Sequence, residues 1–184
     1  MLPYSSQALT IVSDIRSNGD YVRDLSEFIR DHMISDGGSY AFATLWNQFG
    51  NKVDSNRSTS FAVMVPTQKL MDRLEIGGRI AKSRLDIYAS DANLKMLEVL
   101  FNMSVGNVIP LKDDLSLFVE NQEDHPIQLK LNASKVPILV LDVTSNTTIN
   151  VTKFVQREYK GRIIYFIYIT GILATNDVKD FIMN

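Results

Sequence analysis

The sequence of 184 residues contains no cysteine and only two histidines. Without cysteine the chain has no disulfide framework, no thiolate nucleophile and no cysteine-based zinc site. His32 falls within a predicted helix and His125 precedes a proline in a polar turn, and neither has a carboxylate or a second histidine at ligand spacing. The chain also lacks the Gly-x-Ser-x-Gly motif of an activated serine. We therefore predict no catalytic residue, no metal ligand and no cofactor, and we expect the protein not to be an enzyme.

The sequence also lacks an excess of positive charge. It has 19 basic and 21 acidic residues, a formal net charge of -2 and no polybasic run. Nucleic-acid binding depends on a concentrated basic surface that releases counterions from the phosphates. We therefore expect the partners to be other proteins and not nucleic acid.

Long apolar segments are missing as well. The longest apolar run covers residues 163–169 and includes two tyrosines, whereas a membrane-spanning helix needs about 20 predominantly apolar residues. Residues 1–7 show neither the basic nor the apolar region of a signal peptide. We expect no membrane span, and an intracellular or virion-associated protein in preference to a secreted one.

The residues that are present predict a folded domain. The chain is 45% hydrophobic and 22% charged, which is typical of a globular protein. We predict one domain over residues 1–184, with a short N-terminal extension and a polar loop near 50–60. Helical spacing dominates the first half of the chain and a period of two dominates the second. Helices are predicted over 9–15, 20–36, 39–49, 67–74, after 78, over 91–101 and from 176; strands are predicted over 61–65, 105–111, 115–119, 127–131, 137–143, 147–155 and 162–170.

This order of elements predicts an α+β domain with a mainly antiparallel sheet, because helices come first and strands follow. The predicted strands 147–155 and 162–170 are expected to be edges of that sheet. Unpaired backbone groups at an edge recruit partner strands, so these two segments are candidate docking surfaces.

Three segments resemble the fasciclin-like domain family. Residues 10–25 are similar to its opening helices, and residues 147–173 to its closing pair of strands. Residues 61–74, FAVMVPTQKLMDRL, look like the family's signature block, which consists of a strand, a Pro-Thr turn and a helix. Here Pro66 ends the strand and Thr67 is placed to cap the helix. The resemblance implies a fasciclin-like fold, with N-terminal helices packed on a C-terminal, mainly antiparallel β-sheet or sandwich. The family's central Tyr-His pair is missing at residues 102–103, so its receptor-binding residues are not carried over.

Five Asn-x-Ser/Thr sequons are candidate glycosylation sites if the chain enters a secretory pathway. In an intracellular protein they are simply polar residues of loops and strands. The five asparagines are Asn56, Asn102, Asn132, Asn146 and Asn150.

These observations predict a non-enzymatic protein-protein interaction domain with a structural or adhesive role. Both a cell-adhesion module and a minor component of a large assembly, such as a viral capsid, fit the sequence. The alternative is a module that binds a small ligand or a glycan in a pocket between the helices and the sheet.

Overall fold

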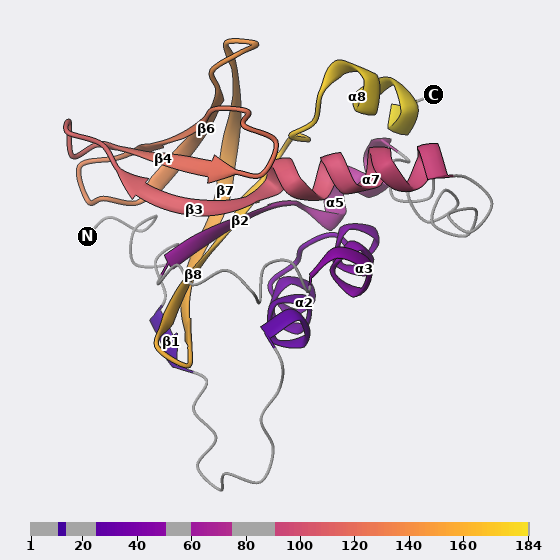
Figure 1. Ribbon diagram of the computed structural model, residues 1–184. Coiled ribbons are helices and arrows are strands. Elements are labelled where there is room, and N and C mark those ends of the chain that lie inside the picture. Colours follow the sequence, from indigo (N-terminus) through magenta and orange to yellow (C-terminus); the bar gives the residue numbers. More distant parts are fainter. Residues whose placement is uncertain (1–10, 14–24, 51–59, 75–90, 184) are drawn as a thin grey trace, which may run out of the picture.

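The computed structural model describes residues 11–13, 25–50, 60–74 and 91–183, which form eight strands and five helices (Figure 1). The strands are β1 (Ile11–Ser13), β2 (Ser60–Pro66), β3 (Val105–Pro110), β4 (Ser116–Asn121), β5 (Ile127–Leu131), β6 (Pro137–Asp142), β7 (Thr147–Tyr159) and β8 (Arg162–Ile169). The helices are α2 (Leu25–Ser35), α3 (Tyr40–Phe49), α5 (Gln68–Leu74), α7 (Asp91–Ser104) and α8 (Asn176–Met183).

Seven of the strands close into a barrel. The strand order is β7-β6-β5-β4-β3-β2-β8, and β8 pairs again with β7 to complete the ring. The pairing of β2 with β8 is parallel, and every other pairing within the ring is antiparallel. Strand β1 lies outside the ring, where it pairs in parallel with residues 156–158 of β7.

The predicted fold class is therefore wrong. The described chain is mostly β, with a closed barrel and a few short helices, and it is not a fasciclin-like α+β arrangement of N-terminal helices packed on a mainly antiparallel sheet or sandwich. The period-two pattern located the individual strands, but closure depends on β2 pairing with β8, which lies far away in the sequence. The family resemblance itself stays a prediction.

The two predicted edge strands are also internal to the ring. Strand β7 pairs with β6, β8 and β1, and β8 pairs with β2 and β7. Each has a neighbouring strand on both sides, so the prediction that 147–155 and 162–170 are edge strands of the sheet is wrong. The predicted helix over 9–15 is wrong in its described part, because Ile11–Ser13 forms a strand.

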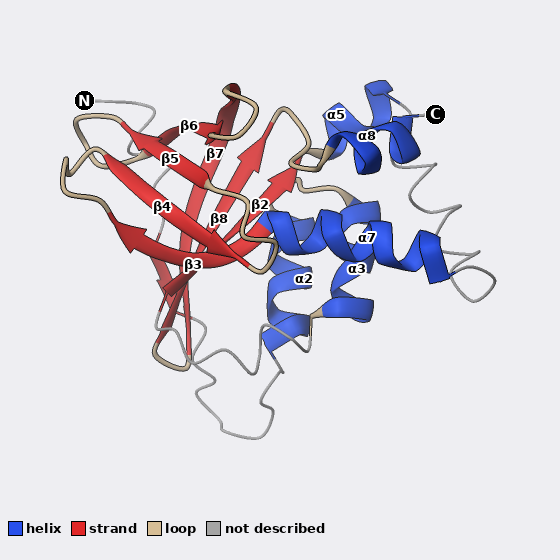
Figure 2. Cartoon of the chain, turned by 45° about the horizontal axis from the view of Figure 1, so that its top comes forward, coloured by secondary structure: helices blue, strands red, loops and turns tan. Residues whose placement is uncertain are grey.

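Helices α2, α3 and α7 lie against one side of the barrel (Figure 2), and the barrel wall separates two hydrophobic cores. Alternate residues of β8 point to opposite sides, so Phe166 packs with the helices and Ile167 packs inside the barrel. In strand β2, Val63 packs with the helices and Met64 packs inside the barrel. Both strands are therefore covered on both faces, which explains why they read as continuous apolar runs.

The ends of the N-terminal helices follow the predicted signals. Gly37 has φ 93°, a left-handed conformation that suits glycine just after a helix. The Ser39 side chain accepts a hydrogen bond of 3.0 Å from the Phe42 amide and caps α3, and Gly50 lies at the other end of α3. The single-domain prediction and the polar loop near 50–60 fall partly or wholly outside the described residues and stay predictions.

Candidate functional site

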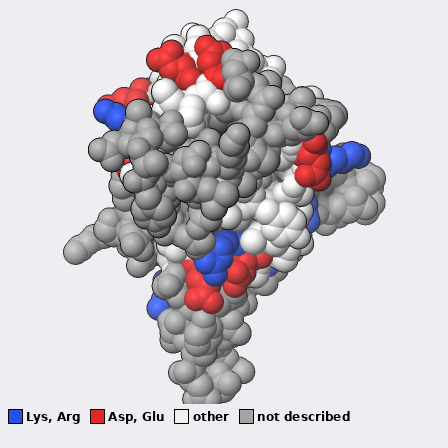
Figure 3. All heavy atoms as spheres, turned by 90° about the vertical axis from the view of Figure 1, so that its right-hand side faces the viewer, with Lys and Arg blue, Asp and Glu red and all other residues white. Residues whose placement is uncertain are grey.

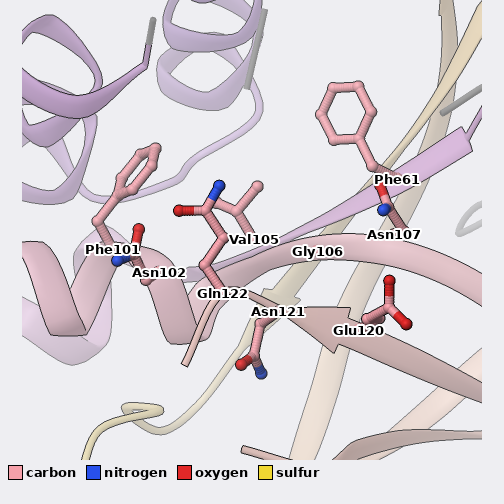
Figure 4. Close-up of a pocket in the computed structure, with 9 residues that line it drawn as sticks. All are labelled: Phe61, Phe101, Asn102, Val105, Gly106, Asn107, Glu120, Asn121 and Gln122. Carbon is pink, nitrogen blue, oxygen red and sulfur yellow. The ribbon is translucent and has the colours of Figure 1, made fainter. Parts of the chain in front are cut away.

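A small open pocket lies where α7 meets strands β2, β3 and β4 (Figure 4). It encloses about 110 Å³ and combines aromatic, amide and carboxylate side chains. The lining residues are Phe61, Phe101, Asn102, Val105, Gly106, Asn107, Glu120, Asn121 and Gln122.

One wall of the pocket is a row of residues across three neighbouring strands. Phe61 of β2 is paired with Asn107 of β3, and Asn107 is paired with Glu120 of β4. Directly paired residues place their side chains on the same face of a sheet. The strand register therefore sets a ring, an amide and a carboxylate side by side on the outer face of the barrel.

Gly106 makes this wall possible. Helix α7 ends at Ser104 and β3 begins at Val105, so the chain passes from helix to strand without a loop. A Cβ atom on Gly106 would lie 2.4 Å from the carbonyl oxygen of Glu120. Only glycine lets β3 and β4 approach this closely at the point where the helix enters the sheet.

The opposite wall is the turn between β4 and β5, which Asn121 holds in shape. Its Oδ1 accepts hydrogen bonds from the amides of Glu123 (3.0 Å) and His125 (3.1 Å). Its Nδ2 donates to the carbonyl oxygen of His125 at 2.7 Å. All three bonds lie within the turn, so this wall is formed before any ligand arrives.

Two longer-range contacts fix the turn to the rest of the molecule. The Nδ2 of Asn102 in α7 donates to Oε2 of Glu123 at 2.9 Å. The Nε2 of His125 lies 2.7 Å from Oδ1 of Asp142, a buried residue at the end of β6. The turn is thus tied to the helix on one side and to the barrel on the other.

Three polar groups of the pocket remain available to a ligand. Glu120 and Gln122 are exposed, and within the described ranges their side chains make no hydrogen bond. Asn102 is 7% exposed, and its Oδ1 also has no hydrogen-bond partner among the described residues. A carboxylate only accepts hydrogen bonds, so the contact with Glu123 fixes the orientation of the Asn102 amide and leaves its oxygen free.

The aromatic walls are rigid. Phe101 is 1% exposed and packs edge-on against Trp46, with ring centroids 4.9 Å apart. Phe61 is 2% exposed and carries the guanidinium of Arg162 at 5.4 Å from its ring centroid. That contact is a cation–π interaction within the chain itself.

One carboxylate, that of Glu120, lines the pocket, and two more follow in the adjoining turn. Glu120, Glu123 and Asp124 follow one another along β4 and its turn, and within the described part of the chain none of them makes an ion pair. Elsewhere, on the face shown in Figure 3, basic side chains of described residues are scattered among acidic ones.

The residues singled out by the sequence lie mostly elsewhere. Pro66 ends β2, and its carbonyl oxygen accepts from the Ser39 amide at 3.0 Å. The Thr67 hydroxyl oxygen accepts from the Leu70 amide at 3.1 Å, which is the expected cap of α5. Both residues support the helices and take no part in the pocket.

The sequons differ in accessibility. Asn102 is buried in the pocket wall, and Oδ1 of Asn132 accepts from the amides of Ser134 and Val136. Asn146 and Asn150 are exposed, at a turn and at the start of β7. Asn56 lies outside the described residues.

The two histidines have separate environments. The His32 ring in α2 lies 4.4 Å from the Phe28 ring. Neither histidine has a carboxylate at ligand spacing in the sequence, but the fold brings Nε2 of His125 to 2.7 Å from Oδ1 of Asp142. His125 and Asp142 are 17 positions apart in the sequence, and the pairing of β5 with β6 brings them together. No local motif therefore reveals the contact.

In the described part of the chain, no group of three or more His, Asp or Glu side chains is arranged to hold a metal ion. None of the described helices has the length and apolar content needed to cross a membrane. Comparison of the sequence with known protein families and with curated proteins gives no match.

Proposed function

We propose that this chain is a non-enzymatic protein-interaction domain, and that the pocket at α7, β2, β3 and β4 receives one side chain of the partner. The observation that carries the proposal is the pocket itself, with preformed walls and free polar groups. A structural or adhesive role belongs to the same proposal, because it requires binding without turnover.

The size of the pocket favours a single side chain. Pockets for small molecules usually enclose about 300–1,000 Å³, whereas this one encloses about 110 Å³. Protein interfaces commonly gain most of their binding energy from a few side chains anchored in well-packed pockets. An anchor of this kind fits the available space.

The rigidity of the walls also favours binding. The turn carrying Gln122 is held by Asn121 and by the contact between His125 and Asp142. Little conformational freedom is then lost when a partner docks, so more of the contact energy appears as affinity.

The test compares two substitutions of exposed glutamines. Gln122→Phe places a ring at the mouth of the pocket, and Gln48→Phe adds the same ring on α3, away from it. After circular dichroism shows that both variants fold, proteins that co-purify from the native source are quantified by mass spectrometry. We expect at least one protein to be recovered with the wild type and Gln48→Phe but to be depleted with Gln122→Phe. Identical recovery with all three proteins would contradict the proposal.

A further inference from the structure

We infer that the partner side chain in this pocket is basic, a lysine or an arginine. This inference rests on the proposed function and specifies the chemistry of the partner. It follows from three properties of the pocket: its free hydrogen-bond acceptors, its charge and its aromatic walls.

The free acceptors call for a ligand that donates hydrogen bonds. Oδ1 of Asn102 lies in a residue that is 93% buried, lines the pocket and has no partner in the described ranges. Its orientation is fixed, because the amide nitrogen must face the carboxylate of Glu123. The Glu120 carboxylate adds acceptor oxygens at the other side of the pocket. Lysine, arginine and tryptophan are the side chains that only donate, and of these lysine and arginine also carry a positive charge.

The charge of the site points the same way. Glu123 accepts a hydrogen bond from a neutral amide, so its negative charge is not balanced by that contact. Glu120 and Asp124 also make no ion pair in the described part of the chain. A cation that enters the pocket therefore meets the carboxylate of Glu120, which makes no ion pair in the described ranges, and the carboxylates of Glu123 and Asp124 follow in the adjoining turn.

The aromatic walls accommodate the rest of the side chain. The aliphatic stems of lysine and arginine cover apolar surface while their charged ends stay near polar groups. Phe61, Phe101 and Val105 line the pocket and are 2%, 1% and 7% exposed, so they offer such a stem a small apolar contact. The guanidinium of Arg162 already lies 5.4 Å from the Phe61 ring centroid, so the charged end of the partner side chain is assigned to the oxygens of Glu120 and Asn102 and not to this ring.

The inference is tested on the whole ¹⁵N-labelled chain by NMR titration with four probes at millimolar concentrations. They are the N-acetyl methylamides of arginine, lysine and norleucine, and methyl α-D-mannopyranoside. We expect the arginine and lysine probes to shift the side-chain amide signals of Asn102 and Gln122 and the backbone amides of residues 120–123. Norleucine has a similar stem without the charge, so it should leave these signals in place.

Two matched variants separate the pocket from the general charge of the protein. Glu120→Gln should lower the affinity for the arginine and lysine probes about two- to fivefold, which is the effect of losing one exposed charge pair. Asp180→Asn removes the same charge from an exposed position in α8 and should leave the affinity unchanged. Added salt should weaken the binding as well.

The alternatives give different results. The inference would be overturned if norleucine bound as well as the basic probes, or if neither basic probe shifted the signals. The proposed function would still be tested separately, by the comparison of Gln122→Phe with Gln48→Phe. Binding of the mannoside alone would overturn the inference and would favour a glycan as the ligand of this pocket.

Discussion

Asp36 shows how one side chain joins the helices to the barrel. It lies between α2 and α3, and its carboxylate accepts hydrogen bonds from Arg157 of β7 at 3.0 and 3.1 Å. It also accepts one from the Tyr168 hydroxyl of β8 at 3.1 Å. Burial, followed by the charge of Asp36 and this hydrogen bond, raises the pKa of Tyr168 well above its usual 10.0. The phenol therefore stays protonated in the folded state under alkaline conditions.

The raised pKa predicts a loss of stability at alkaline pH. Above about pH 10 the unfolded chain ionises Tyr168 while the folded chain keeps its proton, so the unfolded state is favoured increasingly, by up to about 1.4 kcal/mol per pH unit. Tyr168→Phe should cost about 1 kcal/mol at pH 7, where the hydrogen bond is lost, and should make the decline above pH 10 shallower. Urea unfolding between pH 7 and 11 measures both effects.

Tyr40 provides the control, because its side chain is exposed and Tyr40→Phe removes a hydroxyl of the same kind. The stability of Tyr40→Phe should depend on pH in the same way as that of the wild type. If Tyr168→Phe declined as steeply as the wild type above pH 10, the buried phenol would not be the source of the alkaline loss.

At the scale of elements, the sequence predicted most boundaries because their signals are local. Strands β5 and β6 and helix α3 lie within about one residue of their predicted ranges, and turn residues and caps define their ends. The pocket could not be predicted in this way. It depends on the register of β2, β3 and β4 and on Asn102 meeting Glu123, which are contacts between separate elements.

Closure of the barrel escaped prediction for the same reason. The apolar run of β2 is compatible with many partners, and only the folded chain shows that it lies parallel to β8. The short strand β1 has a similar origin, because Ile11–Ser13 is extended through its pairing with β7. Tertiary pairing thus overrides a local helical spacing.

The cap of α5 gives a prediction at this scale. Thr67→Ala removes the hydroxyl oxygen that accepts the Leu70 amide and should lower the free energy of unfolding by about 1 kcal/mol. Thr67→Ser keeps the oxygen and should retain most of that stability. Urea denaturation of the three proteins measures the difference. An equal loss in both variants would assign the effect to the threonine methyl group instead of the cap.

At the scale of the whole molecule, the two cores share one wall. Strands β2 and β8 contribute side chains to the helix-facing core and to the barrel interior. A cavity opened on either side loosens the same strands, and Asp36 couples the layers further through β7 and β8. The helices and the barrel should therefore unfold as one cooperative unit.

This cooperativity can be measured with a single substitution inside the barrel. Ile167→Ala leaves a cavity among fully buried side chains and should lower the free energy of unfolding by about 2–5 kcal/mol. Trp46, the single tryptophan, lies in the helix-facing core, so its fluorescence follows that core, whereas far-UV circular dichroism follows the secondary structure of the helices and the barrel together. Both signals should move to the same lower urea midpoint, whereas Ile109→Ala on the exposed barrel surface should move neither by much. A tryptophan transition that kept its wild-type midpoint would mean that the helical layer is stable without the barrel, and the shared wall would then not couple the two cores.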